Sequence, residues 1–381
     1  MSAPDAPALS GGQPAANVRA DDRLGRFFLP GPTEVRPDVL AAQVKPMIGH
    51  RGPEMSALME RLQDGLRPLF RTEWPVLVST SSATGFMEAA VRNGVERRAL
   101  ALVNGAFSER FAAMVRESGL EVETLDVGWG GVHEPSRVAE ALARGAFDAV
   151  VVVHSETSTG VLNPVADLAR VAHDAGAVIL VDAVTSLGGS PVEPDAWQLD
   201  FTLTGSQKAL ALPPGLAFGV AQPAMLERAR RSTRRGTYFD LLEFEAQLEK
   251  KQTPNTPALS LLYALERQLA NIAAEGLDAR WARHRAMAER TWRWVEELAR
   301  RGVAVRVLAP EGARAWTVTC VCMPGDEGAA ALVRRVAARG WTIAGGYGDL
   351  KDRMFRIGHM GDHTVARLED LLGVIEEELV G

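Results

Sequence analysis

The sequence predicts an α/β fold, in which helices cover both faces of a mainly parallel sheet and a smaller α+β domain follows at the C-terminus. Three observations predict it. At 381 residues the chain is long enough for two domains and too long for one compact core. Short apolar runs alternate with helical patterns through the middle of the chain, which is typical of right-handed β–α–β units. Chemically distinctive side chains follow the ends of three of these runs, where the active sites of such sheets lie.

The middle of the chain supplies the elements of this sheet. Apolar runs that predict buried strands occupy residues 76–78, 100–103, 122–127, 150–153, 178–181 and 201–203, and a further strand is expected at 217–221. Most of these runs are separated by helical patterns at 84–97, 107–118, 135–144 and 165–175. We therefore expect the sheet to form the core of a large domain over residues 23–272.

The last third of the chain has a different pattern. A long helical region at 259–301 is interrupted at Gly276, and strands are expected at 303–308, 316–323 and 353–357. Further helical patterns occupy 328–339 and 364–379. These elements predict a small C-terminal α+β domain over residues 273–381. Residues 1–22 are rich in Ala, Pro, Gly and Asp and are expected to form a disordered leader or arm.

Composition narrows the class of protein. The net charge of -6 gives no reason to expect nucleic acid or an anionic membrane as a partner. No run approaches the roughly 20 apolar residues of a membrane span, and the first residues lack the basic start and apolar stretch of a signal peptide. The two cysteines, Cys320 and Cys322, are separated by one residue in an expected strand. They cannot form a disulfide that links distant segments, which fits a reducing cytoplasm. We expect a cytoplasmic protein without a metal site.

Lys208 is the most informative residue in the chain. It follows the strand expected at 201–203, and Asp182 follows the strand expected at 178–181. A lysine amine forms a Schiff base with the aldehyde of pyridoxal phosphate, and a carboxylate holds a proton on the pyridine nitrogen, so that the ring acts as an electron sink. Either residue alone is more often an ordinary surface charge. The motifs around them favour a pyridoxal phosphate site.

Five segments of the sequence resemble the class V, fold-type I aminotransferases, in particular the alanine/serine–glyoxylate (serine–pyruvate) branch. The likeness runs from about residue 29 to the C-terminus, with the segments in the family's order and at similar gaps. The segments are 29–33 (LPGPT), 81–90 (SSATGFMEAA), 154–161 (HSETSTGV), 205–210 (GSQKAL) and 355–359 (FRIGH). The resemblance implies a seven-stranded sheet in the large domain, pyridoxal 5'-phosphate as the cofactor, and a homodimer.

The phosphate of the cofactor is expected at the start of a helix. Ser82, Ala83 and Thr84 open a predicted helix directly after a strand, which offers backbone amides, hydroxyls and a helix dipole to an anion. Gln207 is expected to donate its side-chain amide to the same phosphate. The resemblance implies that a loop containing Thr253 crosses the dimer interface to the neighbouring subunit's phosphate, so that each active site needs both subunits.

The ring and the substrate are expected to contact residues from other segments. The resemblance places Phe107 over the pyridine ring; the equal alternative is an aromatic side chain that faces the core at the start of a helix. The resemblance also places the Thr157 hydroxyl at the ring oxygen. Arg356 is the candidate for the substrate carboxylate, because a guanidinium offers a planar, bidentate fork. A structural salt bridge is the alternative for this arginine. Gly31 is expected to let the backbone approach the substrate.

The residues and the resemblance together predict a pyridoxal-phosphate-dependent transaminase. The resemblance implies that it moves an amino group from a small L-amino acid, serine or alanine, to glyoxylate or pyruvate. Only one arginine matches a carboxylate-binding motif, which favours monocarboxylic substrates over glutamate. A transaminase of the same class that uses phosphoserine, 2-aminoethylphosphonate or ureidoglycine as the amino donor is an alternative. The basic stretch that includes Arg234 and Arg235 keeps the phosphorylated donors possible. A cysteine-desulfurase-like lyase would need a mobile-loop cysteine, whereas both cysteines lie in a strand-like run. A non-catalytic partner subunit is a further alternative, which the intact Asp182–Lys208 pair disfavours.

Overall fold

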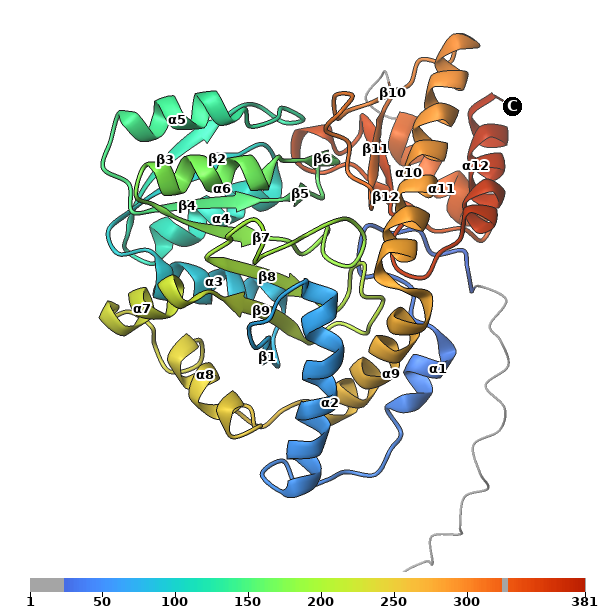
Figure 1. Cartoon of the computed structure of the whole chain (residues 1–381). Coiled ribbons are helices and arrows are strands. Elements are labelled where there is room, and N and C mark those ends of the chain that lie inside the picture. Colours follow the sequence, from blue (N-terminus) through green and yellow to red (C-terminus); the bar gives the residue numbers. More distant parts are fainter. Residues whose placement is uncertain (1–23, 324–327, 381) are drawn as a thin grey trace, which may run out of the picture.

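The computed structural model describes residues 24–323 and 328–380 of the chain. Its largest element is a seven-stranded sheet (Figure 1). In their order across the sheet, the strands are β1 (Leu77–Ser79), β9 (Ala217–Ala221), β8 (Phe201–Gly205), β7 (Val178–Asp182), β4 (Ala149–Val153), β2 (Arg98–Val103) and β3 (Glu121–Asp126). β9 is antiparallel to both of its neighbours, and every other pairing is parallel. This mixed, mostly parallel sheet confirms the predicted α/β class.

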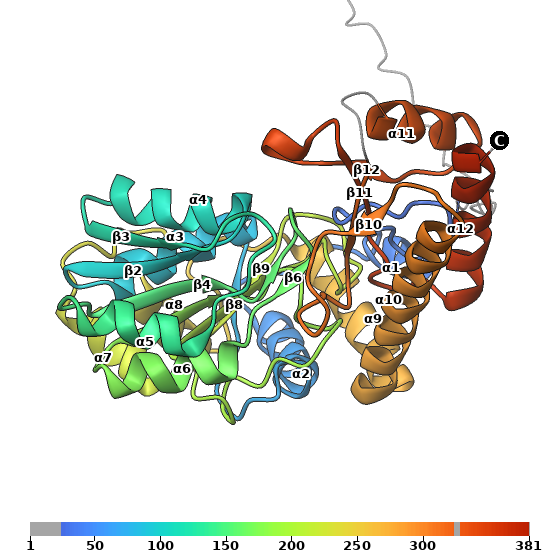
Figure 2. The same ribbon diagram turned by 90° about the horizontal axis from the view of Figure 1, so that it is seen from above.

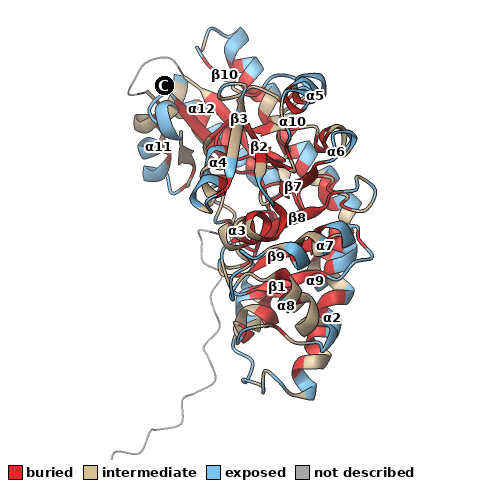
Figure 3. Cartoon of the chain, turned by 90° about the vertical axis from the view of Figure 1, so that its left-hand side faces the viewer, coloured by how far each residue is buried: buried red, intermediate tan, exposed pale blue. Residues whose placement is uncertain are grey.

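Helices cover both faces of the sheet. One face packs against α3 (Ala83–Gly94), α4 (Ala106–Glu117), α7 (Pro223–Arg231) and α8 (Leu241–Glu249). The opposite face packs against α2 (Pro53–Phe70), α5 (Pro135–Ala143), α6 (Val165–Asp174) and α9 (Leu259–Glu275), and α1 (Pro37–Ala42) lies against α9. Figure 3 shows the strands buried between helices whose outward faces are exposed.

The strands are apolar throughout because each of their faces meets a helix layer. In β7, Val178 and Leu180 point into the core on the α3 side, whereas Ile179 and Val181 point into the core on the α2 side. This alternation with a period of two residues explains why the central strands appear in the sequence as continuous apolar runs.

Two predicted elements differ from the structure for identifiable reasons. The run at 122–127 was expected to be a buried strand, but β3 is the edge strand of the sheet and most of its residues are exposed or half-buried. The helix expected at 84–97 ends at Gly94 instead. The Asp148 carboxylate accepts backbone hydrogen bonds from Glu96, Arg97 and Arg98 at 2.7–2.9 Å, which holds these three residues out of the helix and leads the chain into β2.

The C-terminal part of the chain forms a second core beside the large sheet (Figure 2). Its antiparallel sheet consists of β10 (Arg306–Val307), β11 (Thr319–Cys322), β13 (Met354–Ile357) and β12 (Ala344–Gly345), in that order. Its helices are α10 (Leu277–Arg300), α11 (Gly328–Ala338) and α12 (Val365–Val380), and a short 3-10 helix, η1, spans Gly348–Leu350. Phe28 also packs in this core and stacks on His363 at 3.9 Å, so the described N-terminal segment contacts the C-terminal part.

The strands of this second sheet are shorter than the sequence suggested. Of the run expected at 303–308 only Arg306 and Val307 pair, and the expected strand at 316–323 is reduced to β11. The expected leader at 1–22 lies outside the described residues. No helix in the described part of the chain is both long and apolar enough to cross a membrane.

Candidate active site

The carboxyl ends of neighbouring parallel strands bring the predicted residues together. β4, β7 and β8 are adjacent, so the segments that follow them meet at one edge of the sheet, as is usual for such sheets. A small hairpin, β5 (Ser155–Glu156) and β6 (Val161–Leu162), follows β4 directly. One cavity at this edge is lined by eight of the predicted site residues, namely Ser82, Ala83, Thr84, Phe107, Thr157, Asp182, Gln207 and Lys208.

Lys208 is buried at the bottom of this arrangement. Its side chain is 8% exposed, and its ammonium donates a hydrogen bond to the carbonyl of Pro30. Gly31 makes room for it, because a Cβ at Gly31 would lie 2.4 Å from the Lys208 Cδ, and the backbone there has a φ of +103° that favours glycine. Burial, together with the charge of the nearby Arg356 guanidinium, lowers the pKa of the Lys208 amine to about 8.

Asp182 ends β7 and is almost fully buried. One carboxylate oxygen accepts a hydrogen bond from the Val184 N–H at 2.8 Å. The other oxygen has no hydrogen-bond partner within residues 24–323 and 328–380, so it is available to a group in the cavity. Burial raises the pKa of the Asp182 carboxyl to about 7, and the charge of Lys208 opposes that rise.

The opposite end of the cavity is a cradle of polar groups. Ser82 is the N-cap residue of α3, yet its hydroxyl makes no capping hydrogen bond to the helix. The side-chain oxygens of Gln207 and Ser155 are buried, line the cavity and lack a hydrogen-bond partner in the described residues. The N–H groups of a helix N-terminus and the hydroxyls of Ser82 and Ser155 can donate to an anion such as a phosphate, as can the amide NH₂ group of Gln207.

Glu156 is an important residue that the sequence analysis missed. Its carboxylate is fully buried and accepts hydrogen bonds from the backbone N–H groups of Ser108 (2.9 Å) and Ser158 (3.1 Å) and from both of their hydroxyls. It also faces the N–H of Phe107 at 3.4 Å. A carboxylate at this position satisfies the first N–H groups of α4 and fixes the helix start that carries Phe107. The signal was present in the sequence, because Glu156 lies inside the 154–161 segment.

Two other contacts within the cavity could not be predicted. The Thr157 hydroxyl forms a hydrogen bond of 2.5 Å with the Thr185 hydroxyl, from the turn that follows β7. Arg110 also lines the cavity, and its guanidinium carbon lies 5.1 Å from the centre of the Phe107 ring. Thr185 lies 28 residues from Thr157 in the sequence, whereas Arg110 lies on α4 three residues after Phe107.

Arg356 reaches the same region from the small sheet. It lies on β13 with 9% of its surface exposed, and its Nε and Nη1 donate hydrogen bonds to the carbonyls of Gly345 (2.9 Å) and Thr157 (3.3 Å). Within the described residues no carboxylate forms an ion pair with it, and its Nη2 has no hydrogen-bond partner. Burial lowers the pKa of this guanidinium.

The structure places Thr253 away from this cavity. Its hydroxyl donates to the carbonyl of Asn255 at 2.7 Å, and its own carbonyl accepts from Arg51 at 2.6 Å. Thr253 is therefore not brought together with the other predicted residues inside one subunit, and its contact with a neighbouring subunit stays a prediction.

The cysteines do not form a reactive site. Cys320 and Cys322 are unpaired thiols on β11, and burial raises the pKa of Cys320 well above its ordinary value. A thiol of this kind is a poor nucleophile, which removes the support for a desulfurase-like chemistry.

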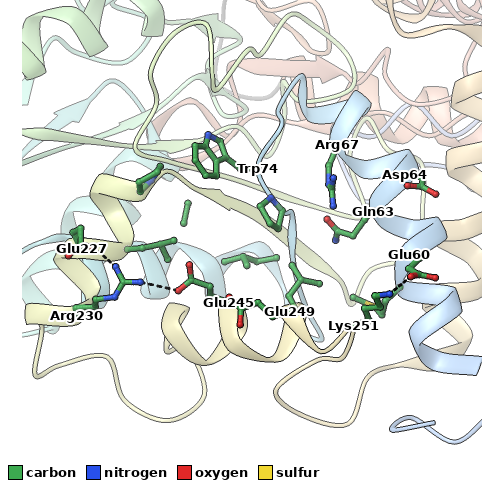
Figure 4. Close-up of a pocket in the computed structure, with 17 residues that line it drawn as sticks. Glu60, Gln63, Asp64, Arg67, Trp74, Glu227, Arg230, Glu245, Glu249 and Lys251 are labelled. Carbon is green, nitrogen blue, oxygen red and sulfur yellow. Dashed lines mark hydrogen bonds and ion pairs between the residues drawn. The ribbon is translucent and has the colours of Figure 1, made fainter. Parts of the chain in front are cut away.

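A larger cavity, of about 620 Å³, lies between α2, α7 and α8 near the start of β1 (Figure 4). Apolar side chains such as Leu77, Leu226 and Leu248 line much of it. Arg230 on its rim pairs with the carboxylates of Glu227 and Glu245. It lacks the buried lysine and aspartate of the smaller cavity, so its size does not make it the chemical centre.

Comparisons with known proteins agree with this geometry. The family model for Aminotransferase class-V matches residues 38–336. The chain is 40% identical to an uncharacterized aminotransferase of Methanocaldococcus jannaschii, over 88% of this chain and 87% of that protein. It is 32% identical to a serine–glyoxylate aminotransferase of Methylorubrum extorquens, over 95% and 93% of the two chains.

The chain belongs to the class V aminotransferases. A solved alanine–glyoxylate aminotransferase of Nostoc superposes with a TM-score of 0.88 at 30% identity, covering 96% of this chain and 98% of that one. The predicted family and its fold type are thereby confirmed.

Pyridoxal phosphate is the cofactor of this aminotransferase, and the residues present fit it. The polar cradle at Ser82–Thr84 and Gln207 suits the phosphate, the free oxygen of Asp182 suits the ring nitrogen, and the Lys208 amine, which lines the same cavity, suits the aldehyde. When bound, pyridoxal phosphate withdraws electrons from the substrate Cα and carries the amino group from donor to acceptor.

The depressed pKa of Lys208 predicts how its reactivity depends on pH. A lysine amine reacts only when neutral, and burial moves the loss of its proton down to a pH of about 8. Covalent capture of the aldehyde cofactor by apoprotein, trapped with borohydride and located by mass spectrometry, should therefore rise with pH with a midpoint near that value. The exposed Lys250 serves as an internal reference, and identical pH profiles for the two lysines would contradict the assignment.

The hydrogen bonds of Glu156 predict that even its isosteric amide is not tolerated. In Glu156→Gln the new NH₂ group must face N–H and hydroxyl donors, so at least one buried donor is left unpaired. We expect the free energy of unfolding to fall by about 1–3 kcal/mol, measured by urea denaturation. Glu134→Gln is the matched control, because Glu134 precedes α5 without capping it. Equal effects of the two substitutions would show that Glu156 does not hold α4.

Proposed function

We propose that this enzyme moves the amino group of a small L-amino acid, serine or alanine, to glyoxylate or pyruvate. The similarity to serine–glyoxylate and alanine–glyoxylate aminotransferases supports the choice of substrates. The single observation that carries the proposal is the state of Arg356, a buried guanidinium beside Lys208 that has no acidic partner in the described residues.

A buried guanidinium without an anion is unusual because desolvation of the charge has a large cost. The chain contains a direct contrast in Arg280, which is also buried but forms ion pairs with Glu275 at 2.8 Å and Asp362 at 2.9 Å. Arg356 is held by two carbonyl groups that orient it without neutralising it. A substrate carboxylate supplies the missing charge, and the planar fork fixes the direction of the substrate Cα–H bond.

The other residues divide the work of proton transfer. The Lys208 amine, with a pKa lowered to about 8, takes the proton from the substrate Cα and returns it at the neighbouring carbon of the cofactor, as base and then as acid. Asp182 holds a proton at the ring nitrogen through its free oxygen. Glu156 keeps Phe107 against the ring by fixing the start of α4. The burial of these groups excludes water from the transfer.

We also propose that the enzyme works as a cytoplasmic homodimer. Thr253 lies on a loop that does not contribute to its own subunit's cavity, and the family resemblance assigns this loop to the neighbouring subunit's phosphate. The two free thiols support a reducing compartment.

Arg356→Lys tests the recognition of the carboxylate. The substitution keeps the positive charge but loses the fork, so we expect kcat/KM for serine and alanine to fall by two to three orders of magnitude, roughly 3–4 kcal/mol of transition-state stabilisation. Cofactor content and thermal stability should change little, and amines without a carboxylate should lose far less. Arg334→Lys, an exposed position on α11, is the control. An unstable variant whose active fraction keeps wild-type kinetics would identify Arg356 as a structural residue.

A complementation experiment tests the shared site. Lys208→Ala subunits are mixed with Thr253→Ala subunits, each of which is inactive or severely impaired alone. In a mixed dimer one of the two sites combines a wild-type Lys208 with a wild-type Thr253, so turnover should recover to about half of the wild-type value per dimer. Absence of recovery after confirmed subunit exchange would place Thr253 outside the neighbouring subunit's site.

A further inference from the structure

A loop of the C-terminal part reaches over to the cavity of the large sheet. It connects β12 to β13, contains η1 and carries Tyr347. The centre of the Tyr347 ring lies 5.9 Å from the centre of the Phe107 ring, at an interplanar angle of 43°. The guanidinium carbon of Arg356 lies 5.6 Å from the centre of the Tyr347 ring. Tyr347 thus lies beside both the residue expected over the cofactor ring and the candidate for the substrate carboxylate.

The loop is packed tightly against the large sheet's own helices and turns. A Cβ at Gly348 would lie 2.7 Å from the Trp129 ring, so the indole rests directly on the loop backbone. The Trp129 Nε1 in turn donates a hydrogen bond of 2.8 Å to Glu109, which lies on α4 two residues after Phe107. The position of Tyr347 relative to Phe107 is therefore fixed from both sides, and its ring forms a wall.

The contribution of Tyr347 comes from the bulk of its ring. Its side chain is 36% exposed, and its hydroxyl has no hydrogen-bond partner in the part of the chain that the structure describes. Arg356 is held by hydrogen bonds to the carbonyls of Gly345 and Thr157 and forms none with this hydroxyl.

The stereochemistry of an amino acid then defines where its side chain must go. Three substituents of the Cα are accounted for by the proposed function: the carboxylate on Arg356, the nitrogen on the cofactor that would carry it, and the hydrogen towards Lys208. The fourth substituent is the side chain, which has to enter the remaining space beside Arg356 and Phe107. The Tyr347 ring lies beside both of these residues.

We propose that Tyr347 is the residue that restricts the enzyme to amino acids with small side chains. Its ring closes the space into which a side chain larger than methyl or hydroxymethyl would extend. This inference rests on the proposed function, since it takes the substrate carboxylate to lie on Arg356. It adds a specificity determinant from the small sheet to a site whose chemistry lies on the large one.

The kinetic test uses the holoenzyme and single-turnover half-reactions with alanine, leucine and phenylalanine. In Tyr347→Ala the ratio of kcat/KM for leucine or phenylalanine to that for alanine should rise by about tenfold to a hundredfold, because filling or removing apolar volume in a pocket has effects of this size. Tyr347→Phe keeps the ring and should keep the wild-type ratio. Tyr347→Leu provides a second, milder truncation should the alanine variant fold poorly.

A binding measurement supplies a readout that does not depend on turnover. Propanoate and 3-phenylpropanoate carry the carboxylate but no amine, and calorimetry gives their dissociation constants for the same variants. Tyr347→Ala should improve binding of 3-phenylpropanoate relative to propanoate by at least about tenfold. Unchanged ratios in both experiments, with a folded variant, would overturn the inference.

An error in the proposed function and an error in the role of Tyr347 would give different experimental results. Were the wild-type holoenzyme to react with no small amino acid, or to bind propanoate as well after Arg356→Lys as before, the proposed function itself would be wrong. If the wild-type enzyme reacts with small amino acids and Arg356→Lys weakens propanoate binding, the proposed function stands. Only the role of Tyr347 would then be wrong if its substitution left the preference for small side chains unchanged.

Discussion

The burial of Lys208 and Asp182 at the ends of two paired parallel strands is the constraint on which the site depends. Removal from water penalises both charges, so the pKa of the lysine amine falls to about 8 while that of the aspartic acid rises to about 7. The lysine amine is thereby brought close to the pH at which it can exchange a proton. A lysine on the surface would stay protonated and could neither capture an aldehyde nor accept a proton from carbon.

The surrounding structure makes this burial tolerable. Glu156 and Arg356 add a second pair of opposite charges nearby, and each is held by neutral hydrogen-bonding groups. Glu156 is satisfied by donors at the start of α4, whereas Arg356 still has a donor without a partner in the described residues. The surroundings of Lys208 therefore include a satisfied anion and a cation with an unsatisfied donor, an asymmetry that suits an anion beside Arg356. Arg356 comes from the small sheet and Lys208 follows a strand of the large one, so under the proposed function the relative position of the two sheets would set the substrate geometry.

Much of this arrangement could be predicted from the sequence, because it follows from local pattern. Asp182 and Lys208 each follow an apolar run in the sequence, which marks the end of a strand. Neighbouring parallel strands bring their carboxyl ends to the same edge of the sheet. Even the missed helix α2 has a readable signal, since Met55, Leu58, Leu62 and Leu66 recur at helical spacing. The contacts that escaped prediction are non-local. The Asp148 carboxylate binds the backbone just after α3 although it lies 51 residues away in the sequence. Tyr347, from the small sheet's side, contacts Phe107 on a helix of the large sheet. The spacing of residues within one segment carries no information about either contact.

The most direct test of the central claim is a half-reaction between the purified holoenzyme and single amino acids, followed through the visible absorbance of the bound cofactor. The account predicts that L-serine and L-alanine change this absorbance rapidly and that glyoxylate then restores it, whereas large side chains react slowly. A holoenzyme whose absorbance responds to neither amino acid, or that responds only to donors with a second acidic group, would contradict the account.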